Sequence, residues 1–352
     1  MSSKKSIICI ASNTSDFIFS DIDFLANKYE VFVDVHSWNN KKLTPLFFIQ
    51  QLFFLIKQIK KAEAILISFG GYWSFLPTLV GKWFNKPTYI ILHGTDCASI
   101  PPLNYGSLRK KMLRYFIKKS YQNATALLPV SSSLVHVKNT YYSDDKYSYQ
   151  GFKHFYPKLN TDYFVINNGL DIDFWNIENY PEKNEKSFIS VFSDAQFILK
   201  GGDIILEVAK FFPDYSFYIA GCKTPLSIGE VSKNVSFLGK IAKEELRSYY
   251  RKAQFHFQLS IFEGFGLALC EAMLCCCIPI VSSVNILPEI VGENGFVLDK
   301  RDVELLKKTL ENAIALRDKK MMGEKVRNSI VKRYNLKNRE DKLTSIIEKG
   351  EI

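Results

Sequence analysis

The sequence lacks the long apolar segments that define membrane-spanning and secreted chains. Crossing a bilayer takes about 20 apolar residues, but the longest apolar cluster, residues 46–56, is interrupted by Gln50 and Gln51. Residues 6–11 are too short for the apolar part of a signal peptide and read as a first β-strand. We therefore expect a cytoplasmic protein, either soluble or peripheral at the inner face of the membrane.

Metal-binding patterns are also missing. The seven cysteines include no Cys-x-x-Cys pair, and no histidine lies at ligand spacing. The two Asp-x-Asp sequences, at residues 21–23 and 171–173, fall in loop or helix contexts and not at the end of an expected strand. We expect small, buried, reduced cysteines, and neither a metal nor another cofactor.

Negative charge is scarce in the first half of the chain. Residues 1–168 contain 10 Asp and Glu against 20 Lys and Arg, whereas residues 169–352 contain 26 of each. The N-terminal half should therefore meet something acidic. In residues 108–121 basic and apolar side chains alternate, which on a helix gives a basic face for an anionic membrane surface or an acidic glycan. A surface helix packed on its own sheet shows the same pattern, and no nucleic-acid motif accompanies it. The basic residues are Arg109, Lys110, Lys111, Arg114, Lys118 and Lys119.

Two series of short apolar runs predict two parallel sheets. Continuous apolar runs indicate strands that are buried on both faces, and longer mixed segments between them indicate helices. The first series is residues 6–11, 31–35, 64–69, 88–93, 126–130 and 164–167, and the second is 188–192, 217–220, 235–238, 255–259, 278–281 and 296–298. At 352 residues the chain suits two domains of this doubly wound α/β type. Polar residues 177–186 are the expected hinge.

The most informative stretch is residues 260–273, where a strand, a glycine-containing turn and a helix follow one another. Amides of a first helical turn and the helix dipole make such a corner suited to an anion. Two carboxylates, Glu263 in the turn and Glu271 two helical turns later, are suited to hydroxyl groups. Between them lie Gly264, Phe265, Gly266 and Leu267.

This run resembles the Glu-seven-residues-Glu signature of retaining nucleotide-sugar glycosyltransferases with the GT-B fold, the large family four. The resemblance implies two Rossmann-like domains facing a cleft and a C-terminal helix that crosses back to the N-terminal domain. The expected boundaries are 1–170 for the acceptor-side domain, 171–186 for the linker, 187–332 for the nucleotide-sugar domain and 333–352 for the crossing helix. It also implies front-face attack without a metal, with the leaving phosphate taking the acceptor's proton.

The resemblance assigns donor-side roles to several residues. Lys200, before Gly201, would neutralise the diphosphate, although alone it reads as a solvated turn. Glu263 would meet the transferred sugar, or simply cap a helix, and Glu271 would accept both ribose hydroxyls, or be an exposed helix carboxylate. Gly239 and Lys240 resemble the turn beneath the base, or are an ordinary strand end. The family's arginine about five residues before the lysine is replaced here by Ala195.

Acceptor-side residues are expected at the strand ends of the first domain. His93-Gly-Thr-Asp96 resembles the family's His-Gly-x-Asp loop, in which His93 would bond the donor hexose and Asp96 would position neighbouring groups; both residues could instead be structural. Gly71 and Tyr72 follow the third strand. The Tyr-rich residues 141–163 form either an acceptor-facing loop or an insertion that packs on itself.

The sequence thus predicts a retaining, metal-independent glycosyltransferase acting from a nucleotide sugar on a glycan or lipid-linked acceptor, in surface polysaccharide synthesis. Two alternatives stay open. One is another GT-B enzyme, an epimerase or hydrolase, and the other is a non-catalytic nucleotide-sugar-binding or membrane-scaffold protein. Donor sugar, nucleobase, acceptor and oligomeric state are not encoded in any motif.

Overall fold

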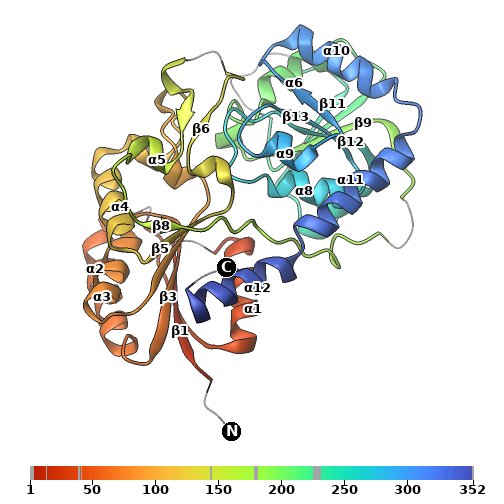
Figure 1. Ribbon diagram of the computed structural model, residues 1–352. Helices are drawn as coiled ribbons and strands as arrows, with labels where there is room; N and C mark the ends of the chain where they lie inside the picture. Colours follow the sequence, from red (N-terminus) through yellow and green to blue (C-terminus); the bar gives the residue numbers. More distant parts are fainter. Residues whose placement is uncertain are drawn as a thin grey trace. The chain divides into compact units, whose positions relative to one another are not determined.

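The computed structural model describes residues 4–12, 14–38, 40, 42–142, 145–177, 181–224 and 231–350. The chain forms two compact units, which Figure 1 labels by element. Unit 1 is Met1–Val137, Tyr149–Asn168 and Lys337–Ile352, and unit 2 is Lys138–Ser148 and Gly169–Leu336. Each contains one six-stranded parallel sheet with helices on its faces, which confirms the predicted doubly wound α/β class.

The sheet of unit 1 has the strand order β2-β1-β3-β4-β5-β8, and every pair is parallel. Strands β1, β4 and β5 are buried along their whole length, as expected for continuous apolar runs in a sheet covered by helices on both faces. The strands are β1 Ser6–Ala11, β2 Glu30–Val35, β3 Ala62–Ser68, β4 Thr88–Leu92, β5 Ala126–Pro129 and β8 Asp162–Tyr163. The helices are α1 Asp16–Lys28, α2 Thr44–Gln58, α3 Phe75–Trp83, α4 Lys111–Asn123, α5 Phe152–Phe155 and α12 Leu336–Lys349.

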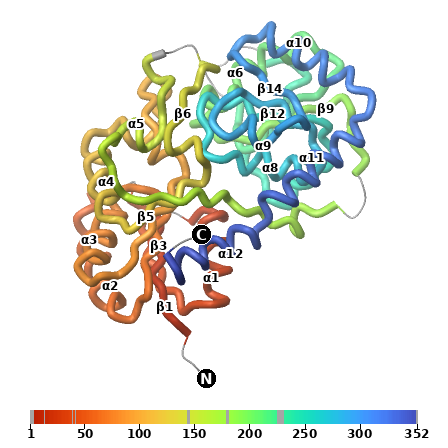
Figure 2. Tube along the Cα trace, viewed as in Figure 1, coloured from red at the N-terminus to blue at the C-terminus, as the bar shows by residue number. Residues whose placement is uncertain are grey.

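The C-terminal helix α12 packs in unit 1, as predicted, beside α1 (Figures 1 and 2). Arg339 donates to both carboxylate oxygens of Asp21 on α1 at 2.6 Å and to the carbonyl of Ile166 at 3.1 Å. Both charged side chains are almost fully buried. The Tyr89 hydroxyl of β4 donates to the carbonyl of Ile346 at 2.9 Å. The end of the chain is therefore held in the core of unit 1.

The sheet of unit 2 has the order β11-β10-β9-β12-β13-β14, again all parallel. Four phenylalanines on β9, β10 and β12 stack at its centre, with the Phe188 ring 4.9 to 5.0 Å from those of Phe217, Phe255 and Phe257. The strands are β9 Asn184–Val191, β10 Ser216–Ala220, β11 Val235–Gly239, β12 Ala253–Gln258, β13 Ile278–Ser282 and β14 Phe296–Leu298. The helices are α6 Gly202–Ala209, α7 Lys243–Lys252, α8 Leu267–Leu274, α9 Leu287–Val291, α10 Val303–Ile314 and α11 Lys319–Arg333.

Three details differ from the expectations. The last strand of unit 1 lies at Asp162–Tyr163 and not at 164–167, although Phe164 and Ile166 continue to donate to β5 carbonyls. Residues 184–186 of the expected hinge begin β9. Residues 141–163 are divided: part joins unit 2 and the rest joins unit 1 through β7 Tyr149–Gln150, which pairs with β6 Val137–Lys138. No helix in the described part of the chain is long and apolar enough to span a bilayer.

Candidate active site

The order of strands in unit 2 reverses between β9 and β12, and the predicted donor residues lie at that point. Lys200 follows β9 and Glu263 follows β12, both beyond the carboxyl ends of the strands. In open parallel sheets, ligands bind in the crevice outside such a reversal. The two loops are joined because the Ile261 N–H donates to the Leu199 carbonyl at 2.7 Å. Backbone pairing therefore places the lysine beside the glutamate.

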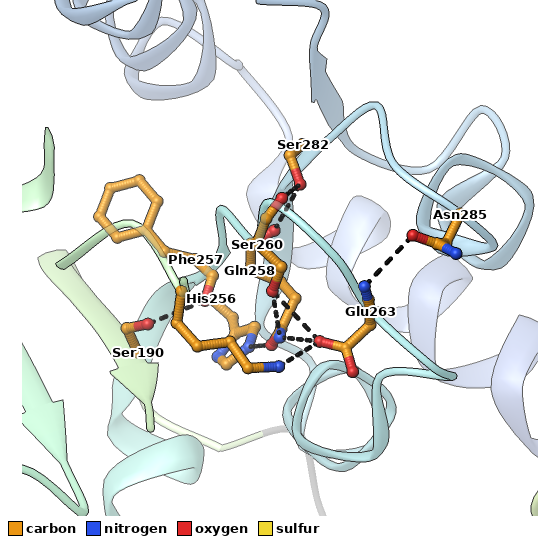
Figure 3. Close-up of polar contacts among 9 residues, drawn as sticks. Ser190, His256, Phe257, Gln258, Ser260, Glu263, Ser282 and Asn285 are labelled. Carbon is orange, nitrogen blue, oxygen red and sulfur yellow. Dashed lines mark hydrogen bonds and ion pairs between the residues drawn. The ribbon is translucent and has the colours of Figure 1, made fainter. Parts of the chain in front are cut away.

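One oxygen of the Glu263 carboxylate receives three donors. Lys200 Nζ lies 2.5 Å from Oε2, Gln258 Nε2 donates to the same atom at 2.6 Å, and the Ser260 hydroxyl does so at 3.1 Å. Figure 3 shows Gln258 and Ser260 converging on this oxygen. The Lys200 and Glu263 side chains are only 13% and 12% exposed, so water screens the ion pair little. No recorded interaction of the described residues uses the other oxygen, Oε1.

A buried histidine fixes the orientation of Gln258. His256 Nε2 lies 3.3 Å from Gln258 Oε1, and burial lowers the pKa of His256 to about 4, although the bond to Gln258 opposes the shift. A neutral imidazole has one N–H, and an amide oxygen only accepts. Nε2 therefore carries the proton, and the Gln258 amide nitrogen is directed at Glu263.

The backbone of the same loop is held from β13. Asn285, which adopts a positive φ of 51°, accepts the Glu263 N–H at 3.3 Å through Oδ1. Asn139 donates to the same oxygen at 3.1 Å and accepts the Asn285 N–H at 3.0 Å. Asn139 belongs to the segment of residues 138–148 that packs in unit 2. Thus both the carboxylate and the backbone of Glu263 are fixed.

The glycines predicted around the site permit close packing. Gly201 has a φ of +78°, and a Cβ there would lie 2.7 Å from the Leu259 carbonyl oxygen. Gly266 has a φ of +102° and precedes α8, whose first residue is Leu267. Gly264 and Phe265 are buried in the turn. Glu271 lies on α8 and is partly exposed. The residues from Glu263 to Glu271 thus form the turn before α8 and its first part.

Other predicted donor residues lie elsewhere in unit 2. Gly239 ends β11 and the exposed Lys240 follows it; β11 is the edge strand and is separated from β12 by β10 and β9. Gly239 has a φ of +64°, and its N–H donates to Cys222. Ala195 lies exposed in a short turn after β9. Among the residues described, no three His, Cys, Asp or Glu side chains cluster in a way that could hold a metal ion.

In unit 1, His93 and Asp96 lie together at the carboxyl end of β4. Burial, helped by the charge of Arg339, holds the pKa of His93 well below its usual value, and its Nε2 is buried without a partner. The imidazole packs against the rings of Phe17 and Phe69, with centroids 4.9 and 4.3 Å away. His93 is therefore neutral and can act only through hydrogen bonds.

Asp96 has a supporting position. Its side chain is fully buried and accepts the N–H groups of Gly70, His93 and Gly94 at 2.9, 3.2 and 3.0 Å. Burial raises the pKa of Asp96 to about 6, although these amide bonds act in the opposite direction. The carboxylate thus ties together the loops after β3 and β4, and it faces backbone instead of open space.

The remaining predicted residues of unit 1 are separately placed. Gly71 is buried and donates to the Ser74 hydroxyl at 3.0 Å, while Tyr72 packs on Phe116 of α4. The basic residues lie on or just before α4, and most are exposed. Arg109 is an exception because its guanidinium donates to Asn104 and to the Gly106 carbonyl.

Sequence reasoning missed the residues that position Glu263. His256, Gln258 and Ser260 continue the alternation that Gln254 begins, with apolar residues between them, along a buried strand and its exit. Alternate strand residues share a face, so three buried polar side chains there indicate a polar network directed at one point. Asn139 and Asn285 left no such pattern because they are 146 residues apart and meet only through folding.

Unit 2 and the whole chain resemble known glycosyltransferases. Residues 173–329 match the family model of glycosyl transferases group 1. The chain is 39% identical over 72 residues to O-antigen chain mannosyltransferase B of Escherichia coli, a match that spans 20% of this chain and only 19% of that protein. It is 25% identical over 271 residues to O-antigen chain mannosyltransferase RfbU of Salmonella typhimurium, covering 70% of each.

Two solved structures share the whole architecture. WaaG, a glycosyltransferase involved in lipopolysaccharide biosynthesis, superposes over 98% of this chain and 100% of its own with a TM-score of 0.68 at 13% identity. Anabaena HepE in complex with UDP superposes over 97% and 99% with a TM-score of 0.68 at 14% identity. The fold is GT-B, and residues 173–329, which contain Lys200, Glu263 and Glu271, match the model of the group 1 glycosyltransferase family.

Proposed function

We propose that the protein transfers a sugar, with retention of configuration, from a nucleotide sugar to a glycan or lipid-linked glycan acceptor in surface polysaccharide synthesis. The observation that carries this proposal is the Lys200–Glu263 pair, 2.5 Å apart, at the strand-order reversal of unit 2. It combines a cation for a diphosphate with a carboxylate for a sugar at the place where open sheets bind ligands.

In this proposal Lys200 and Glu263 bind different parts of the nucleotide sugar. Lys200 uses one N–H on Glu263 and has others for the diphosphate, whose negative charge grows as the glycosidic bond breaks. Amides at the start of α8 face the same charge. Glu263 keeps Oε1 for a hydroxyl of the transferred sugar and stabilises positive charge near the anomeric carbon. Glu271, further along α8, would accept the ribose hydroxyls.

Retention and independence from metal are parts of the same proposal. We assign Glu263 an electrostatic role, in which Oε2 is held by three donors and Oε1 would accept a hydroxyl of the sugar. The acceptor hydroxyl would attack from the face of the leaving group, and the phosphate oxygen would take its proton. Lys200 and the α8 amides supply positive charge that other enzymes obtain from a cation.

The relatives suggest which donor to examine first. Two of them are named as O-antigen mannosyltransferases, which makes a nucleoside diphosphate mannose the first candidate, and the UDP complex of HepE makes UDP-sugars the second. In unit 1 the neutral His93 would bond a hexose hydroxyl. Asp96 would act indirectly, by holding the loop that carries His93.

The test is turnover across UDP-, GDP-, ADP- and TDP-sugars with lipid-linked and free glycan acceptors, comparing wild type with Glu263→Gln. We expect one donor class to be used, product with retained configuration, and a loss of about 10²–10³-fold in kcat with donor binding partly kept, because the amide lacks the charge. Glu207→Gln, an exposed carboxylate on α6 that pairs with Lys210, is the matched control and should keep full activity.

Other outcomes identify the rival functions. Release of sugar or an epimerised nucleotide sugar without an acceptor would indicate a hydrolase or epimerase of the same fold. Full function in Glu263→Gln would indicate a binding or scaffold protein. Inversion of configuration would overturn the mechanism while leaving transfer intact.

A further inference from the structure

Helix α2 exposes several large apolar side chains, unlike an ordinary surface helix. Such a helix buries its apolar side chains and exposes its polar ones, but α2 buries only Gln51 and Leu55. Gln51 donates to Asp34 at 2.9 Å inside unit 1, while Phe53, Ile56 and Ile49 are 70%, 55% and 54% exposed. Burial of a polar group in place of these side chains leaves a continuous apolar ridge on the outside.

Neighbouring helices carry further exposed apolar side chains. Helices α2, α3 and α4 lie in one layer of unit 1 (Figures 1 and 2), and the Phe48 ring of α2 contacts Phe116 of α4 with centroids 6.1 Å apart. Trp83 at the end of α3 is 66% exposed, and Met112 on α4 is 64% exposed. Scattered exposed apolar residues are normal, but a contiguous set of large ones marks an interaction surface. The apolar ridge is Leu46, Ile49, Leu52, Phe53, Ile56, Trp83, Phe84, Met112 and Tyr115.

The charges around the ridge are almost all positive. Residues 43–123 contain only two acidic residues, Glu63 and the buried Asp96. Four exposed cations of α4, Lys111, Arg114, Lys118 and Lys119, make no ion pair in the described part of the chain. The eleven basic residues are Lys57, Lys60, Lys61, Lys82, Lys86, Arg109, Lys110, Lys111, Arg114, Lys118 and Lys119.

We propose that this ridge docks on an anionic lipid bilayer, with α2 lying in the headgroup region and the cations of α4 on the lipid phosphates. An apolar face flanked by Lys and Arg is the pattern of interfacial helices. A second copy fits poorly, because a symmetric interface would bring both basic sets together. The proposal deepens the proposed function, since it rests on that function for a lipid-linked acceptor, but lipid binding itself does not require catalysis.

The experiment is co-sedimentation with vesicles of phosphatidylcholine alone and of phosphatidylcholine with phosphatidylglycerol, at low and high salt. Ile49→Ser/Phe53→Ser should weaken binding to mixed vesicles by at least about tenfold at both salt concentrations, because burying one such side chain exceeds a factor of ten. Lys118→Gln/Lys119→Gln should weaken it by about tenfold at low salt only. Phe211→Ser, at an exposed apolar position on unit 2, should bind as wild type.

Two results would overturn the proposal. The first is unchanged vesicle binding by Ile49→Ser/Phe53→Ser. The second is a wild-type protein that is a dimer in light scattering, an Ile49→Ser/Phe53→Ser variant that is a monomer, and no vesicle binding by either protein. That result would identify a second copy as the occupant of the ridge. Turnover of a detergent-soluble acceptor separates the two proposals: vesicle binding without turnover rejects only the enzyme, and turnover without vesicle binding rejects only the docking surface.

Discussion

Replacing Gln258 with leucine tests whether the buried network positions Glu263. The substitution removes the 2.6 Å bond to Glu263 Oε2 and leaves the Nε2–H of buried His256 without its acceptor. A hydrogen bond to a charged group contributes about 1.5–3 kcal/mol, and an unsatisfied buried donor costs about 1–3 kcal/mol. Leucine recovers part of this through apolar contact, so we expect the free energy of unfolding to fall by about 2–4 kcal/mol.

Activity should fall for a separate reason. Without Gln258, the carboxylate keeps Lys200 and Ser260 but loses the donor that opposes the pull of the lysine. A carboxylate free to rotate toward Lys200 would occupy the N–H groups meant for the diphosphate. We therefore expect a drop of about tenfold in kcat together with weaker donor binding, which corresponds to about 1.4 kcal/mol.

The assay is urea unfolding, steady-state transfer and nucleotide-sugar binding on the same preparations. Gln51→Leu is the matched control, because it also removes a buried Gln–carboxylate bond, of 2.9 Å, but in unit 1. It should lose comparable stability and keep donor affinity. Gln258→Leu with reduced stability but unchanged kcat and donor affinity would refute a positioning role and leave the network purely structural.

Three further substitutions have defined outcomes. The pKa of Asp96 is about 6 in the folded protein and 3.8 in the unfolded chain. Between these two pH values the folded protein binds the extra proton, so its free energy of unfolding falls as the pH rises and stops falling above about pH 6. Relative to Asp96→Asn, wild type should therefore lose roughly 2.5 kcal/mol of unfolding free energy from pH 4 to 7, and parallel pH curves in urea unfolding would contradict this. Arg339→Met leaves Asp21 buried and unpaired and should cost about 3–5 kcal/mol with early proteolysis of α12; a protease-resistant helix would oppose it. Gly201→Ala drives a Cβ to 2.7 Å from the Leu259 carbonyl and should weaken nucleotide-sugar binding measured by calorimetry, whereas an unchanged Kd would show that the loop adjusts.

Most strands were predictable because parallel strands buried on both faces must be continuously apolar. Residues 6–11 and 296–298 were predicted with the bounds that β1 and β14 have. Residues 164–167 failed because edge strands are short and carry less of this pattern; β8 has two residues, both exposed. The hinge was misjudged at residues 184–186 because three polar residues began a strand that becomes buried only from Ser187.

The residues of the candidate site also include some that the sequence could suggest and some that it could not. Glu263, Glu271 and Lys200 could be proposed from the sequence because they lie in short local patterns around a turn and a helix start. Gln258 and His256 could have been found from polar residues alternating in a buried strand. Asn139 could not, because its partner Asn285 is brought to it by tertiary packing. The role of Asp96 also changed, since only its three amide contacts show that it ties two loops together.

The sequence by itself determined the two α/β domains, the donor-side corner and the basic excess of the N-terminal half, because these follow from periodicity, composition and short motifs. Only the tertiary structure decided which side chains meet and which way they face. The composition of residues 46–56 is apolar, but only the structure shows that α2 buries Gln51 against Asp34 and leaves Ile49, Phe53 and Ile56 exposed. Buried polar groups need partners, and such partners are often distant in the chain, so they are decided by tertiary packing.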